Sequence, residues 1–170
     1  MKKFIVLLLL QGLCLTMAAS NIGKLYKSAL SEKGMLYFLY EQKMPKCAHG
    51  ESLKPLLFDV TYVTGNDTVS IKTTVKSKTA YKGTEVTITS GDGEKMSVPT
   101  EVIYRDIIKK GFINRIEIKI PLKEYRKLYN SALPYSIDYG EQNSFQFNAK
   151  QWKKHQNEVN TIWQIIELNR

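Results

Sequence analysis

Residues 56–76 decide the fold class, and they read LLFDVTYVTGNDTVSIKTTVK. Apolar side chains stand at every second position on both sides of the turn signal Gly65-Asn66-Asp67. Because successive side chains of a strand point to opposite faces, each run predicts a strand with one buried face. Two such runs around a tight turn predict an antiparallel β-hairpin. The side chains predicted to point inward are Phe58, Val60, Tyr62, Val69, Ile71, Thr73 and Val75.

The same alternation, or a short apolar run between turn residues, predicts further strands along the chain. Turns rather than regular long helices connect them, which argues against a doubly wound parallel sheet. We therefore predict an α+β, β-rich fold: an antiparallel sheet or β-sandwich of about seven strands, with a C-terminal amphipathic helix and short helical insertions. The further strands are expected at residues 35–40, 86–89, 115–120, 135–139 and 145–147.

Helical spacing of apolar residues predicts four helical segments. Gly34 and Gly111 follow the first two segments as expected helix ends. The C-terminal helix has the clearest start, because Asn148 and Gln151 form a capping box. Its apolar face is expected to contain Trp152, Val159, Ile162, Trp163 and Ile166. The segments are residues 20–33, residues 100–110, a short helix over residues 122–129, and the helix that follows Asn148.

The first 20 residues have the three parts of a secretory signal peptide. A basic start at Lys2 and Lys3 precedes an apolar stretch, and the small residues Ala18-Ala19-Ser20 suit a cleavage site. The apolar stretch is interrupted and shorter than the ~20 residues of a membrane span. We expect residues 1–20 to be removed, residues 21–170 to form a single β-rich globular domain without a transmembrane segment, and the product to be exported to the periplasm, the cell surface or the medium.

Composition and charge narrow the function classes. The chain has 170 residues with 10 Gly, 5 Pro and 2 Cys, which excludes collagen-like, disordered and disulfide-dense proteins. Removal of the leader takes away Lys2, Lys3 and no acid, so the net charge falls from +9 to +7. Cys14 is lost with the leader as well, which leaves Cys47 and no intramolecular disulfide.

A row of lysines is the main candidate binding site. Lys72, Lys76 and Lys78 share strand parity, Lys82 follows them, and no acid lies between residues 68 and 84. On one face of a strand, these side chains would form a positive stripe for phosphate or uronic acid groups. The alternative is that they protect an edge strand from aggregation, as lysines commonly do.

A second candidate is the pair Cys47 and His49 in the loop after the first predicted strand. A Cys close to a His can be an activated nucleophile or part of a metal site. Two ligands do not make a zinc site, and the other His in the chain is His155 on the C-terminal helix. The alternatives are a free thiol or an intermolecular disulfide, and we predict no metal or other cofactor.

These observations favour a non-enzymatic function. No nucleophile-elbow, phosphate-loop or zinc-protease motif occurs in the sequence. Basic residues surround Trp152, but its place on the apolar helix face favours a core role over nucleic-acid binding. We interpret the chain as an exported bacterial envelope domain, a binding or accessory module for an envelope protein or an anionic glycan. The alternative is a small secreted hydrolase whose site is assembled only in the fold.

Overall fold

A computed structural model describes residues 22–45, 55–140 and 143–169. In these residues nine strands form one antiparallel sheet in the order β1-β2-β3-β4-β7-β6-β5-β8-β9. The strands are β1 (Tyr26–Ser31), β2 (Gly34–Met44), β3 (Leu56–Val63), β4 (Thr68–Ser77), β5 (Glu85–Thr89), β6 (Lys95–Ile108), β7 (Gly111–Pro121), β8 (Ser136–Asp138) and β9 (Ser144–Gln146). The helices are α2 (Leu122–Leu128) and α3 (Ala149–Leu168).

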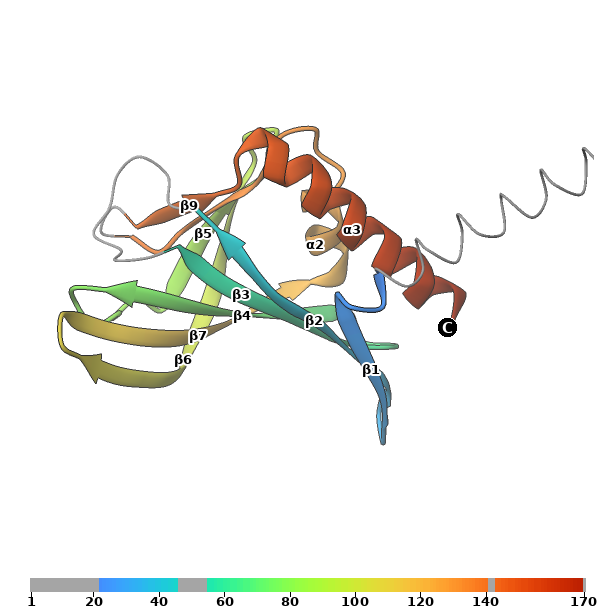
Figure 1. Ribbon diagram of the computed structural model, residues 1–170, viewed down its shortest axis with the longest axis horizontal. Helices are drawn as coiled ribbons and strands as arrows, with labels where there is room; N and C mark the ends of the chain where they lie inside the picture. Colours follow the sequence, from blue (N-terminus) through green and yellow to red (C-terminus); the bar gives the residue numbers. More distant parts are fainter. Residues whose placement is uncertain (1–21, 46–54, 141–142, 170) are drawn as a thin grey trace, which may run out of the picture.

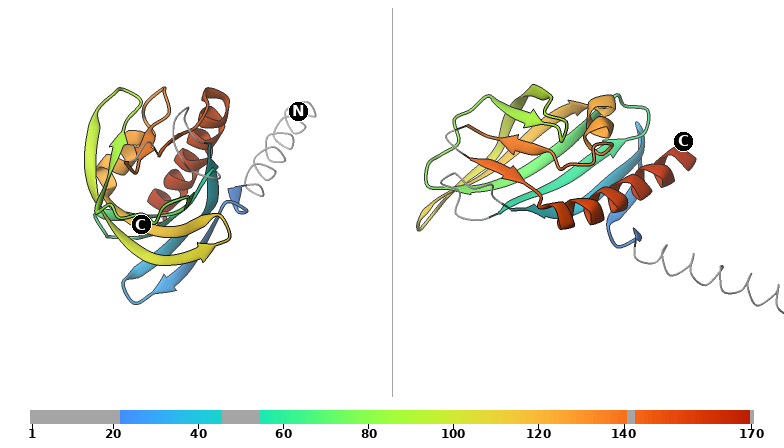
Figure 2. Two further views of the ribbon diagram at one scale, coloured as in Figure 1. Left: turned by 90° about the vertical axis from the view of Figure 1, so that its left-hand side faces the viewer. Right: turned by 90° about the horizontal axis from the view of Figure 1, so that it is seen from above.

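The sheet is a single curled layer and not a sandwich of two sheets (Figure 2). It bends around α2 and α3, and α3 lies across its concave side (Figure 1). The predictions of a β-rich fold, an antiparallel sheet and a C-terminal helix are confirmed, whereas about seven strands was too few. The sandwich alternative is not confirmed, because the described strands form one sheet whose helix-filled concave face buries the apolar side chains that a second sheet would otherwise bury.

The hairpin predicted from residues 56–76 is present as β3 and β4. Phe58 pairs with Thr73 and Val60 with Ile71 across the two strands. The inward side chains are buried, and Ile71 and Val69 have no exposed surface. The alternation of apolar residues therefore correctly predicted both the pairing of these two strands and their buried face.

Two segments that were predicted to be helices are strands. In both segments, a glycine that was predicted to end a helix lies in the turn of a hairpin. Residues 26–31 pair with β2 through a turn that ends at Gly34, with φ of +126°. Ile108 and Gly111 flank a second two-residue turn, and Gly111 has φ of +138°. A glycine with positive φ suits a helix end and a tight hairpin equally well, so the local sequence does not separate them.

Strand β6 changes partner in its middle. Residues 95–99 pair with β5, and residues 100–108 pair with β7. Pro99 stands at the change and has no N–H to give to a neighbour. In the described part of the chain, residues 101–108 have a strand partner on one side only.

Helix α3 fills the concave side with aromatic side chains. The Asn148 side chain accepts a hydrogen bond of 2.8 Å from the Gln151 N–H, which confirms the predicted cap. Trp163 packs edge-on against Tyr62, with ring centroids 4.9 Å apart. Trp152 stacks on Tyr129 at 5.4 Å. Within the described residues, neither helix combines the length and apolar character required to cross a bilayer.

His155 belongs to this aromatic core. Its ring lies 4.6 Å from the Phe147 ring, and its Nε2 is 3.2 Å from the Tyr129 hydroxyl. Burial lowers the pKa of His155 to about 4. The side chain is therefore neutral at pH 7 and is a structural part of the core.

Candidate functional site

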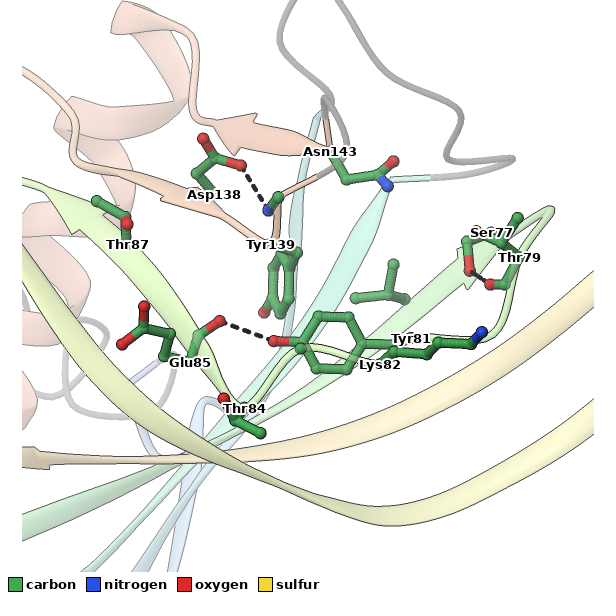
Figure 3. Close-up of a pocket in the computed structure, with 13 residues that line it drawn as sticks. Ser77, Thr79, Tyr81, Lys82, Thr84, Glu85, Thr87, Asp138, Tyr139 and Asn143 are labelled. Carbon is green, nitrogen blue, oxygen red and sulfur yellow. Dashed lines mark hydrogen bonds between the residues drawn. The ribbon is translucent and has the colours of Figure 1, made fainter.

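A polar cleft lies at the end of β4 and is bounded by the loop of residues 78–84 and the β8–β9 turn (Figure 3). Its volume is about 390 Å³, which is within the usual range for a small-molecule site. Hydroxyl, amide and charged groups supply much of its lining. The lining residues are Val75, Ser77, Thr79, Tyr81, Lys82, Gly83, Thr84, Glu85, Thr87, Asp138, Tyr139, Gly140 and Asn143.

Two tyrosines form the aromatic wall of the cleft. The rings of Tyr81 and Tyr139 meet edge to face, with centroids 5.8 Å apart. The Tyr139 hydroxyl donates a hydrogen bond of 2.7 Å to Thr73 Oγ1, and burial raises its pKa. The Tyr81 hydroxyl donates to the backbone oxygen of Glu85 at 2.9 Å. Both rings are therefore neutral and fixed in position before any ligand arrives.

Asn114 of β7 holds the loop that forms one side of the cleft. This fully buried amide accepts hydrogen bonds of 3.2 Å from the Tyr81 N–H and from Arg105 Nε, and donates to Ser77 Oγ at 3.2 Å. Arg105 also donates to the backbone oxygen of Tyr81. One buried side chain thus joins β4, β6 and the loop, so the cleft wall is supported from the sheet below it.

Asn143 supplies an acceptor without a partner. It is 7% exposed, and its Oδ1 has no hydrogen-bond partner in the described part of the chain. Its backbone is fixed, because its N–H donates to Gly140 and its carbonyl accepts from Tyr139. A buried acceptor that is left unsatisfied costs free energy. A ligand hydroxyl that donated to Asn143 Oδ1 would recover that cost.

The charged groups of the cleft are separated in space. Glu85 accepts a hydrogen bond of 2.6 Å from Ser97, and Asp138 accepts one of 2.8 Å from the Gly140 N–H. In the view of Figure 3 these carboxylates lie on one side of Tyr81, while Lys82 and Asn143 extend toward the other side. The two carboxylates do not point toward one another. The cleft therefore presents carboxylates on one side, and an amide and a cation on the other.

The predicted lysine row is divided between three places. Lys72 and Lys76 lie on the open face of β4, and Lys82 lines the cleft. Lys78 follows β4 and lies near the β6–β7 turn. Its Cα is so close to Gly111 that a Cβ added to this glycine would come within 3.1 Å of it. The edge-protection alternative is wrong, because β4 is an inner strand between β3 and β7.

Acids from the neighbouring strands flank Lys72. It stands between Asp59 of β3 and Glu117 of β7 in the strand register. Ser70 donates a hydrogen bond of 2.5 Å to Glu117. That bond and the charges of Lys119 and Lys72 hold the pKa of Glu117 below its ordinary value, against the effect of partial burial. The absence of acids near Lys72 in the sequence is thus offset by pairing with distant segments.

Cys47 and His49 lie outside the described residues. No group of three or more His, Cys, Asp or Glu side chains in the described ranges is arranged to hold a metal ion. Sequence reasoning missed Asn114 and Asn143. Asn114 has the inward parity of Ile116 and Ile118, so a polar side chain at this position was the signal available for it.

No family model, no curated protein and no solved structure matches this chain.

Proposed function

We propose that the protein is an exported, non-enzymatic binding module and that the polar cleft takes a glycan unit bearing an acidic group. The Oδ1 of Asn143, which has no hydrogen-bond partner among the described residues, carries this proposal. It is a buried acceptor on a residue with a hydrogen-bonded backbone that lines a cleft of about 390 Å³, and sugars offer many hydroxyl donors to such an acceptor.

The other cleft groups match the same ligand. Glu85 and Asp138 are exposed carboxylates that can each accept further hydroxyl donors, because a carboxylate has about four acceptor positions. Lys82, on the other side of Tyr81, supplies a cation for a uronic acid carboxylate. The Tyr81 ring offers an apolar surface for the C–H face of a sugar ring.

The divergent carboxylates favour binding over hydrolysis. Glycoside hydrolysis requires two carboxyl groups that face the scissile bond from opposite sides. Here Glu85 is bonded to Ser97 and Asp138 to a backbone N–H, and the two groups point apart. We therefore propose that the protein holds its ligand without cleaving it.

A glycan array followed by calorimetry tests the proposal. The processed protein is applied to neutral and uronic-acid oligosaccharides, and we expect binding that prefers the acidic set. Asn143→Ala should weaken binding about tenfold through loss of a hydrogen bond in a buried site. Asn157→Ala, on the exposed side of α3, is the matched control and should bind normally.

Three results would contradict the proposal: no glycan bound, equal binding by Asn143→Ala, or release of new reducing ends from the bound glycan. Lys82→Gln separates the two parts of the recognition, because it should lower the preference for acidic over neutral glycans and leave neutral binding intact. Mass spectrometry of the secreted protein tests export, with a mature N-terminus expected after residue 18, 19 or 20.

A further inference from the structure

The β6–β7 hairpin ends in an exposed apolar surface. On β6, Ile107 is 77% exposed, Tyr104 52%, Ile103 49% and Val102 36%. These side chains lie within six consecutive residues, although most large apolar side chains of β2, β3, β4 and β7 are buried. Val102 pairs with the inward-facing Ile116 and Tyr104 with the outward-facing Arg115, so the exposed apolar side chains lie on both faces of β6. Exposed apolar side chains that gather on one segment mark interaction sites in soluble proteins.

The geometry of the hairpin keeps this surface accessible. Residues 101–108 have β7 on one side and no described strand on the other. The register shift between Val102 and Tyr104 interrupts regular pairing there. The turn lies at the end of the sheet away from the C-terminus of α3 (Figure 1).

Lysines from two separate segments surround the same turn. Lys109 and Lys110 form the turn itself, between Ile108 and Gly111. Lys76 pairs in register with Ile113 of β7, and Lys78 lies next to Gly111. Asp106 is the one acid between residues 102 and 116. We use the term hairpin end for the four exposed apolar side chains of β6 together with Lys76, Lys78, Lys109 and Lys110.

We propose that the hairpin end docks the protein onto an anionic lipid surface. Apolar and aromatic side chains beside lysines are the composition by which peripheral proteins bind the interface of anionic bilayers. The apolar side chains enter the headgroup region, and the exposed ammonium groups of Lys109 and Lys110 meet lipid phosphates. A second copy of the chain fits less well, because pairing two hairpin ends would bring eight lysines together.

Vesicle sedimentation tests this docking. The processed protein is mixed with vesicles of phosphatidylcholine alone and with vesicles that contain equal amounts of phosphatidylglycerol. We expect binding to the anionic vesicles only, and its loss near 1 M salt, where the Debye length is about 3 Å. Lys109→Gln with Lys110→Gln should reduce binding about 25-fold, since each lysine contributes about fivefold near an anionic surface. Ile107→Ser should reduce it as well.

Matched variants keep the test specific. Lys150→Gln with Lys153→Gln removes the same charge from the exposed side of α3, and Leu30→Ser removes an equally exposed apolar side chain from β1. Both controls should bind like the unchanged protein. Equal loss in the controls, binding to neutral vesicles, or absence of vesicle binding would overturn the proposal. Self-association that Ile107→Ser abolishes, without vesicle binding, would assign the surface to a second copy instead.

Discussion

The two ends of the sheet are built differently. At the α3 end, the concave side is packed with rings, and Trp152 and Trp163 are each 1% exposed. At the other end, β4 reaches Val75 and Ser77, which line an open polar cleft. One strand thus runs from the core to the site, with Val69 fully buried at its start. The packed rings make the helix end the stabilising end, and we propose the open end as the recognition end.

Hydrogen bonds attach α3 to the core, and buried polar atoms without a partner occur at both ends of the described sheet. In the core, Gln156 of α3 donates to the backbone oxygens of Tyr129 and Ser131 at 2.7 and 2.8 Å. Those bonds join the helix to the segment that follows α2. At the open end, Asn143 Oδ1 stays unpaired in the described residues. Among the described residues, the buried Tyr125 hydroxyl and Trp163 Nε1 of the core also lack a partner, so Asn143 Oδ1 is distinguished by its place on a residue that lines the cleft.

Replacement of a core ring should have the largest effect. Trp152→Ala removes a side chain that stacks on Tyr129 and donates to the backbone oxygen of Ser131 at 3.3 Å. We expect the free energy of unfolding to fall by about 3–5 kcal/mol. Chemical denaturation measures it, with the exposed Leu168→Ala as the control. A loss below about 1 kcal/mol would show that the α3 end is not the stabilising end.

Acid should weaken the core through His155. Its pKa is lowered to about 4 in the folded protein, from 6.5 as its ordinary value. The unfolded chain therefore binds the proton first as the pH falls from 6.5 to 4, and stability falls with it by up to about 3 kcal/mol. Denaturation at pH 7 and pH 4 should give a smaller difference for His155→Gln than for the unchanged protein. An unchanged pH dependence in His155→Gln would contradict the buried, neutral histidine.

Loss of Asn114 should act mainly on the cleft. Asn114→Ala leaves the Tyr81 N–H without its acceptor, and we expect a destabilisation of about 1–3 kcal/mol. Amide hydrogen exchange should increase in residues 78–84, while α3 stays protected. Increased exchange in α3 of similar size would mean that the two ends of the sheet are not independent.

The ion pairs on the open face of the sheet should contribute least to the free energy of unfolding. Arg115 of β7 forms an ion pair with Asp59 of β3, and both side chains are about a quarter exposed. Asp59→Asn should therefore cost less than about 1 kcal/mol, as partly exposed pairs usually do. Chemical denaturation at low and high salt measures this loss of unfolding free energy. A loss above about 1 kcal/mol that salt does not change would contradict a solvent-screened ion pair.

The sequence was sufficient for much of the fold where periodicity was strong. Strands β3, β4 and β7, helix α2, and the cap of α3 at Asn148 all followed from spacing and turn residues. It failed at residues 26–31 and 100–108, where helical spacing of apolar residues preceded a glycine. Pairing with β2 and β7 decided those segments, and such tertiary pairing is not encoded in local spacing.

The cleft was not predictable from the sequence for a related reason. Its groups come from residues 75–87, 138–140 and 143, which meet because β5 pairs with β8. Of the predicted site residues that the structure describes, Lys82 is the one that lines the cleft. The sequence predicted that Lys72 would have no acid nearby. Asp59 and Glu117 are distant from it in the sequence, but both are adjacent to it in the sheet.

Backbone amide shifts in the ¹⁵N-labelled protein test the role of the open end most directly. An acidic oligosaccharide selected on the array is added stepwise, and chemical-shift changes are mapped onto the chain. The account predicts changes in residues 79–85, 138–140 and 143, with α3 and the open face of β4 unaffected. Changes confined to Lys72 and its neighbours Asp59 and Glu117, or to α3, would contradict it.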